Sequence, residues 1–200
     1  MTNKQSRVPL YELHPRTTLY PLLLPNGQKK TIEITPGMAF GTGNHTTTVL
    51  CIKMLENLFK ETDIEKVLDV GCGSAILAIC AVTLGAKTAQ GIDIEISVVN
   101  EAIENIAKNG LSSRIGVHLG TIDSINDKFD LITANILIDL IDLMSDELAS
   151  RIKPNGYLII SGFRNEHRDN LKKKFIDLGL ILKYPLYEDE WSALLFNKSK

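Results

Sequence analysis

A glycine-rich turn between a buried-strand pattern and a helix pattern is the clearest chemical signal in this sequence. Residues 67–76 read Val-Leu-Asp-Val-Gly-Cys-Gly-Ser-Ala-Ile. Glycines such as Gly71 and Gly73 let a ligand approach bare backbone at the start of a helix, where free N–H groups and the helix dipole favour a negatively charged group. The turn therefore predicts a nucleotide-like ligand.

The same turn departs from the fingerprint of nicotinamide and flavin dinucleotide sites. That fingerprint needs glycine or alanine at the position of Ile76. Asp69, at the end of the strand pattern, would also repel a pyrophosphate, whereas it would attract a cationic amino group. This charge pattern favours S-adenosylmethionine, whose amino-acid end carries an ammonium group.

A second carboxylate, Asp93, ends the next strand pattern along the chain. In open α/β sheets a ligand lies across the carboxyl ends of neighbouring strands, where a carboxylate can accept both ribose hydroxyls. Either signal alone has an ordinary structural explanation, because an aspartate at a strand end often caps a helix and a glycine turn often serves packing. Together, in this order, they favour one ligand site.

The elements that must position these residues alternate between strand and helix patterns from Glu65 onward. Predicted strands cover Lys66–Val70, Lys87–Ile92, Ile115–Leu119, Phe129–Ala134 and Tyr157–Ser161. Predicted helices cover Ser74–Leu84, Ser97–Asn109, Ile138–Ile152 and Asn165–Leu178. The last two segments, Leu180–Leu186 and Trp191–Asn197, are joined by so short a turn that they must be antiparallel neighbours. The pattern predicts an α/β fold with a mostly parallel sheet.

Composition and charge narrow the class of protein. A chain of 200 residues with 44% hydrophobic and 23% charged residues fits one globular domain, not a disordered chain or a coiled coil. A net charge of −2 gives no bulk attraction to nucleic acid or to an anionic membrane. Cys51, Cys72 and Cys80 form no CxxC motif, which argues against disulfides and structural zinc. With no signal peptide or membrane-spanning stretch, we expect a cytoplasmic protein without a metal site.

Residues 1–35 differ from the rest of the chain because prolines interrupt them, at Pro9, Pro15, Pro21 and Pro25. We predict an irregular arm or linker there with one strand at Lys30–Ile34, followed by a single domain over residues 36–200. The arm is too short to hold a core of its own.

Two further stretches carry a resemblance. Residues 36–48 read Pro-Gly-Met-Ala-Phe-Gly-Thr-Gly-Asn-His-Thr-Thr-Thr, and residues 134–137 read Ala-Asn-Ile-Leu. With the glycine turn, they make the chain resemble seven-strand, S-adenosylmethionine-dependent methyltransferases, and most closely the ribosomal protein L11 methyltransferase family. The likeness runs from about Leu19 to the C-terminus, where Glu190-Trp191 fits the family's ending.

The resemblance implies a three-layer αβα Rossmann-like fold with strand order 3-2-1-4-5-7-6, in which strand 7 is antiparallel. It also implies the cofactor contacts. Residues expected to contact S-adenosylmethionine are Thr48, Gly71, Asp93 and Asn135, joined by Asp69 and Gly73 from the reasoning above, under a cover that includes Phe40, Gly41 and Thr42.

The sequence departs from the family in two places. The family usually has glycine where this chain has Ala75, a replacement that is tolerable if the backbone there is helical. The family's N-terminal α+β domain, which docks onto L11, has no counterpart in this sequence. We therefore expect the resemblance to predict the cofactor better than the substrate, and we expect activity on another acceptor to exceed activity on L11.

Methyl transfer to an amine requires alignment and a neutral nucleophile, because the cofactor already carries its leaving group. The implied catalytic residue is Asn135, whose oxygen can accept from the amine, although an Asx turn would also explain it. We expect His45 to bond to the backbone rather than act as a base. The leading hypothesis is a protein N-methyltransferase acting on a lysine or N-terminal amine. A small-molecule methyltransferase and a non-catalytic cofactor-binding protein are the alternatives.

Overall fold

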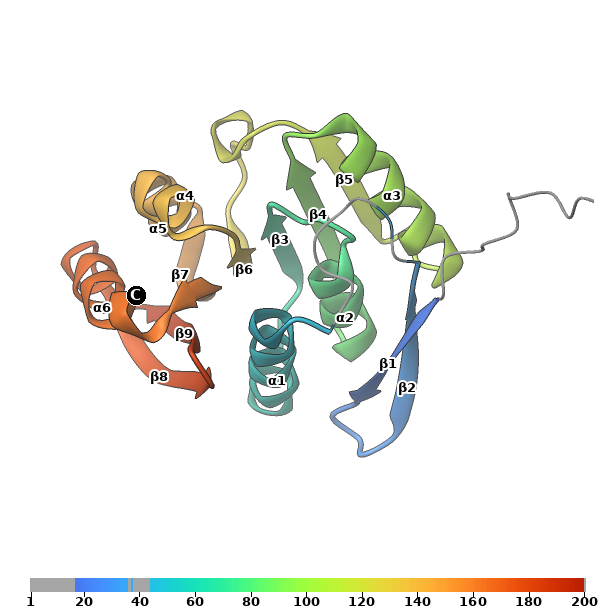
Figure 1. The fold of residues 1–200 in the computed structure, drawn as a ribbon, viewed down its shortest axis with the longest axis horizontal. Helices are drawn as coiled ribbons and strands as arrows, with labels where there is room; N and C mark the ends of the chain where they lie inside the picture. The colour runs from blue at the N-terminus through green and yellow to red at the C-terminus, as the bar shows by residue number, and fades with distance from the viewer. Residues whose placement is uncertain (1–16, 36, 38–43, 200) are drawn as a thin grey trace, which may run out of the picture.

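The computed structural model of this protein describes residues 17–35, 37 and 44–199. Its main feature is a seven-stranded sheet with the order β5-β4-β3-β6-β7-β9-β8 (Figure 1). The strands are β3 (Lys66–Val70), β4 (Thr88–Asp93), β5 (Ile115–Leu119), β6 (Phe129–Asn135), β7 (Ile152–Arg164), β8 (Leu180–Glu188) and β9 (Trp191–Lys198). Strand β9 is antiparallel to both neighbours, whereas β3 to β7 pair in parallel. Counted from β3, the order is the predicted 3-2-1-4-5-7-6, so the predicted fold is confirmed.

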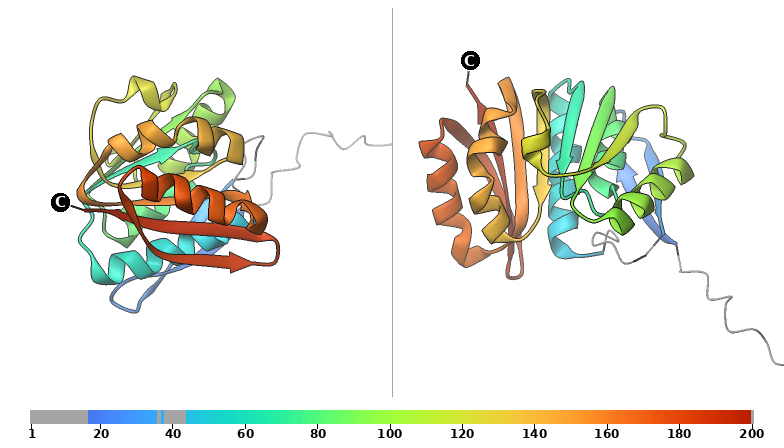
Figure 2. Two further views of the ribbon diagram at one scale, coloured as in Figure 1. Left: turned by 90° about the vertical axis from the view of Figure 1, so that its left-hand side faces the viewer. Right: turned by 90° about the horizontal axis from the view of Figure 1, so that it is seen from above.

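Helices cover both faces of this sheet and complete the three layers (Figure 2). They are α1 (Thr46–Glu61), α2 (Ile76–Leu84), α3 (Ile96–Lys108), α4 (Ile138–Leu143), α5 (Ser145–Ser150) and α6 (Arg168–Asp177), with short 3-10 turns η1 (Ile122–Ser124) and η2 (Asn165–His167). One core contains residues of α1, α2 and α3, and a second contains residues of α4, α5 and α6. Successive residues of β3 alternate between them, since Val67 belongs to the first core and Leu68 to the second. None of the described helices is long and apolar enough to cross a membrane.

The single helix predicted over residues 138–152 is two short helices in the structure, so the prediction of one continuous helix was wrong. Helix α4 ends at Leu143, α5 begins at Ser145, and Ile152 already belongs to β7. The Ser145 hydroxyl donates to the carbonyl of Asp142 over 2.9 Å, which satisfies an acceptor at the end of α4 outside the helical ladder. Ile152 pairs with Phe129 in the sheet, and both are fully buried, so sheet burial overrides helix propensity there.

The strand expected at Lys30–Ile34 is confirmed as part of the N-terminal region, but the expectation that the preceding residues are irregular was wrong over residues 18–23. Strands β1 (Thr18–Leu23) and β2 (Lys29–Ile34) form an antiparallel hairpin. Prolines do not prevent it, because a two-stranded ribbon leaves each strand one free edge, and Pro21 lies in β1 opposite Thr31. Three hairpin residues, Leu22, Ile32 and Ile34, are fully buried in the core shared with α1 and α2. The domain boundary after residue 35 stays a prediction.

Candidate functional site

The glycine turn between β3 and α2 adopts a backbone that side chains disfavour. Gly71 and Gly73 have φ values of 64° and 52°. A Cβ atom on Gly71 would overlap Cγ2 of Ile136, the residue that follows β6. Glycine is therefore required at Gly71 both by conformation and by the close approach of the next strand end.

Ala75 continues this unusual backbone. Its φ of 64° and ψ of 18° place it in the left-handed region, directly before α2 begins. The replacement of glycine by alanine was expected to be tolerable if the backbone there is helical, and this condition is not met. A left-handed conformation costs an L-residue about 1–2 kcal/mol, so the surrounding contacts must hold Ala75 in place.

Asp69 lies behind the turn and caps α2 from the neighbouring strand. It is 1% exposed. The Thr133 hydroxyl donates to Oδ1 over 2.7 Å, and the backbone N–H of Ala78, in the first turn of α2, donates to Oδ2 over 3.3 Å. Burial, the largest influence, raises the pKa of the Asp69 carboxyl to about 7. The predicted direct contact between Asp69 and a ligand gains no support from this geometry, because the carboxylate is buried beneath the turn.

A cavity of about 540 Å³ opens at the carboxyl ends of β3, β4 and β6, the edge of the sheet where the sequence predicts a ligand. Among the predicted site residues, those lining it are Gly71, Gly73, Asp93 and Asn135. Of the other described residues predicted for the site, Thr48 and Asp69 do not line it. Phe40, Gly41 and Thr42 lie outside the described residues. The volume is in the range of small-molecule sites, about 300–1,000 Å³.

Asp93 connects two parts of the cavity wall. Its Oδ2 accepts the backbone N–H of Gly73 over 3.1 Å, and its Oδ1 accepts the N–H of Glu95 over 3.2 Å. A carboxylate has about four acceptor positions, so Asp93 keeps capacity for the hydroxyl groups of a ligand. The same side chain therefore shapes the glycine turn and offers acceptors to the cavity.

Asn135 ends β6 with one half of its amide bonded and the other half unpaired. Its Nδ2 donates over 3.2 Å to the hydroxyl oxygen of Thr48, which is fully buried in α1. Its Oδ1 is buried and has no hydrogen-bond partner among the described residues. A buried acceptor without a partner is costly, and in a cavity wall it indicates a missing donor from a ligand. Thr48 thus acts through Asn135, whose amide it orients.

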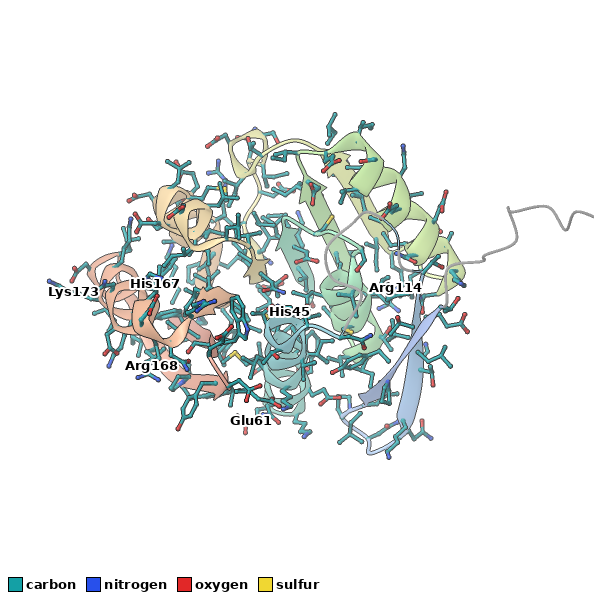
Figure 3. The ribbon with its side chains drawn as sticks, in the orientation of Figure 1. His45, Glu61, Arg114, His167, Arg168 and Lys173 are labelled. Atoms are coloured by element: carbon teal, nitrogen blue, oxygen red, sulfur yellow. The ribbon has the colours of Figure 1, made fainter. Side chains whose placement is uncertain are left out.

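The sequence did not predict several residues of the cavity wall. His45 lies at the start of α1 (Figure 3), where its ring nitrogen accepts from the N–H of Thr47 and its ring contacts Trp191 edge-on at 5.0 Å. Both His45 and Trp191 line the cavity. The backbone bond of His45 agrees with its expected structural role. The match between Glu190-Trp191 and the C-terminal sequence of the family was the signal that could have placed Trp191 in the site.

Sheet order, glycine turn and the carboxylate at the end of β4 together define a Rossmann-like methyltransferase fold. A ribosomal protein L11 methylase from Lactobacillus delbrueckii subsp. bulgaricus has this fold, with a TM-score of 0.76 and 33% identity over 84% of this chain and 86% of that structure. A Salinibacter ruber RNA methyltransferase solved with S-adenosyl-L-homocysteine shares the fold at 15% identity, with a TM-score of 0.57, over 75% of this chain and 88% of that structure.

The chain belongs to the ribosomal protein L11 methyltransferase (PrmA) family, whose model matches residues 12–199. A relative from Syntrophotalea carbinolica with this name is 38% identical over 87% of the chain, and one from Geobacter metallireducens is 42% identical over 82%. These matches cover 57% and 54% of the two relatives, so the chain spans about half the length of the curated relatives.

Proposed function

We propose that this chain binds S-adenosylmethionine and transfers the methyl group to an amine of a protein, either a lysine side chain or an N-terminal amine. Ribosomal protein L11 is one candidate acceptor, because the curated relatives carry its name. That activity on another acceptor exceeds activity on L11 stays a prediction from the sequence. The sequence also leads us to propose a cytoplasmic location, no direct contact with nucleic acid, and a domain boundary after residue 35.

The cavity fits the cofactor in shape and in chemistry. Gly71 and Gly73 line the cavity with backbone that carries no side chain, and Asp93 offers acceptors for ribose hydroxyls. Apolar side chains, among them Ile94 and Ile122, also line the cavity, and they suit the flat adenine base of S-adenosylmethionine. When bound, S-adenosylmethionine supplies a methyl group on a sulfonium that is already a good leaving group.

The residues of this chain would then select and orient the acceptor. Asn135 Oδ1 can accept an N–H of the incoming amine, while Thr48 holds the amide so that this oxygen, and not Nδ2, remains available. An uncharged amide stabilises an ammonium less than a carboxylate would, so it favours the neutral, nucleophilic amine. A free lysine has a pKa of about 10.4, and burial in this partly apolar cavity would lower it.

The unpaired Asn135 oxygen is the single observation that carries this proposal. In a non-catalytic binding protein, nothing would require an amide at the end of β6 to keep its acceptor free and its donor fixed. The Asx-turn interpretation would give Oδ1 a backbone partner, and among the described residues it has none.

The decisive experiment supplies S-adenosylmethionine labelled in the methyl group to the chain, with purified ribosomal protein L11 in one reaction and fractionated bacterial lysate in another. We expect label in protein, acid-stable and attached to nitrogen. Asn135→Ala is the control, and label must depend on the intact residue. Label only in small molecules would replace the proposal by a small-molecule methyltransferase, and cofactor binding without any transfer would replace it by a non-catalytic protein.

A further inference from the structure

Asn105 is a buried polar residue that joins two parts of the molecule far apart in the sequence. It lies on the inner side of α3 and is 2% exposed. Its Oδ1 accepts the backbone N–H of Thr35, just beyond β2, over 2.9 Å. Its Nδ2 donates to the backbone carbonyl of Ser74, within the glycine turn, over 3.3 Å. One side-chain amide therefore bridges the hairpin and the turn, at the place where the end of β2 meets α3 (Figure 1).

The bond from Asn105 falls at the most strained point of the turn. The peptide group between Ser74 and Ala75 is held at both ends: Asn105 binds its carbonyl, and its N–H donates to the carbonyl of Cys72 over 2.8 Å. Ala75 follows at a φ of 64°. Such a conformation persists only where neighbours over-determine it, so losing one of these two bonds weakens the hold on the peptide group.

The peptide group between Cys72 and Gly73, two peptide groups toward the N-terminus, is bonded to a residue of the cavity wall. Gly73 donates its N–H to Asp93, and both residues line the cavity. Asp93 from β4 and Asn105 from α3 thus bind two consecutive residues of the turn, Gly73 and Ser74. The peptide group bound by Asp93 and the one bound by Asn105 are separated by Gly73 and Ser74 alone, so only four soft dihedral angles lie between them and a displacement of one reaches the other.

We propose that Asn105 is a positioning residue for the cofactor, which ties the conformation of the glycine turn to the docking of the β1–β2 hairpin on α3. The inference rests on the proposed function, since the turn is the part of the wall that S-adenosylmethionine would contact. Because linkage is reciprocal, a bound cofactor also holds the hairpin more firmly on α3.

A matched control lies one turn further along the same helix. Asn109 binds the hairpin alone: its Oδ1 accepts the N–H of Glu33 over 3.1 Å, and its Nδ2 donates to the carbonyl of Glu33 over 2.8 Å. Its other bond goes to Asn105's own carbonyl, within α3. Asn109→Ala therefore loosens the hairpin without removing a bond to the turn.

The first readout is the dissociation constant for S-adenosylhomocysteine, measured by calorimetry from pH 6 to 9 with wild type as the reference at each pH. Asn105→Ala should weaken binding about threefold to tenfold at every pH, the usual value of one net hydrogen bond. Asn105→Asp keeps the acceptor for Thr35 and donates to Ser74 only when protonated, so its loss should shrink as the pH falls. Asn109→Ala should stay within about twofold of wild type. Urea midpoints establish that each variant is folded.

The second readout needs no cofactor. Hydrogen exchange across residues 71–78 of the unliganded chain should accelerate in Asn105→Ala and not in Asn109→Ala, with β6 unchanged in both. Absence of S-adenosylhomocysteine binding by the wild-type chain would contradict the proposed function, and exchange would still decide the role of Asn105. Wild-type affinity and wild-type exchange in a folded Asn105→Ala variant would overturn the inference.

Discussion

The two walls of the cavity are built in different ways. On the wall formed by β3, β4 and α3, side chains bind backbone groups of the glycine turn, as Asp93 does at Gly73 and Asn105 at Ser74. On the wall formed by the end of β6 and α4, the side chains after Asn135 are apolar, and Leu137 is 71% exposed. Fixed backbone positions suit one ligand of constant shape, whereas an exposed apolar wall suits contact with a partner. In the proposed function, these are the cofactor and the acceptor.

The largest effect is expected where a polar group interrupts the apolar wall. Asn135→Ala should lower turnover about 100- to 1,000-fold, the usual loss for one preoriented polar group at the reacting atoms. Its free energy of unfolding should fall by only about 1 kcal/mol, because Oδ1 makes no bond and the one bond lost is that from Nδ2 to Thr48. Steady-state rates and urea unfolding measure the two quantities. Full turnover would return Asn135 to the role of a strand terminator.

The buried carboxylate of Asp69, behind the polar wall formed by β3, β4 and α3, should make the free energy of unfolding depend on pH. Burial raises the pKa of Asp69 to about 7, so the folded chain favours the protonated form more than the unfolded chain does. Its contribution is therefore fully present below about pH 4 and is lost as the pH rises through about 7, by an amount on the order of 4 kcal/mol.

Asp69→Asn tests this dependence, since an amide can still accept from Ala78. The free energy of unfolding of the variant, followed from pH 4 to 8 by urea titration, should lose this downward slope. A variant whose slope matches that of wild type would show that the Asp69 carboxyl ionises as readily in the folded chain as in the unfolded one.

Within the polar wall, Asp93 should govern affinity rather than folding. Asp93→Ala should weaken binding of S-adenosylhomocysteine by about 1.5–3 kcal/mol, the usual value of hydrogen bonds to a charged group. Calorimetry measures the loss, and NAD, whose fingerprint needs glycine or alanine at the position of Ile76, serves as the control ligand. Unchanged affinity in a folded variant, or tight NAD binding by wild type, would contradict the assignment of this wall.

The smallest expected effect is a gain. Ala75→Gly removes the penalty of a left-handed alanine but adds flexibility to the unfolded chain, and we expect a net increase of about 0.5–1 kcal/mol in the free energy of unfolding. The urea midpoint should rise with an unchanged m-value. A decrease would mean that burial of the Ala75 methyl group outweighs the backbone strain.

Much of the fold could be predicted from the sequence because its central strands are short apolar runs bounded by turns. Strands β3 and β5 have their predicted bounds. The antiparallel end followed from the length of one turn, and the strand order came from the family resemblance. The prediction failed where tertiary contacts override local preference, as at the break after Leu143 and in the hairpin whose strand β1 contains Pro21.

The site divides in the same way. Gly71, Gly73 and Asp93 could be predicted because glycines and strand-end carboxylates are visible as a pattern. The bond between Thr48 and Asn135 joins residues from different elements, and no local pattern encodes it. The burial of Asp69 could not be predicted from the pattern either. The alternation along β3 does not say which face of the strand α2 covers, and Asp69 is buried because it lies on the face that bonds to α2.

Ile136 also limits how this sequence can change in evolution. Gly162, in the irregular step of the pairing between β7 and β9, has a φ of 96°, and a Cβ atom there would overlap the carbonyl of Ile136. A Cβ atom on Gly71, directly after β3, would overlap the side chain of the same Ile136. Any side chain at either glycine would push Ile136, and with it the adjoining Asn135, out of place. In a saturation library selected for activity, both positions should accept glycine alone, whereas Leu143, 75% exposed on α4, should accept most polar residues.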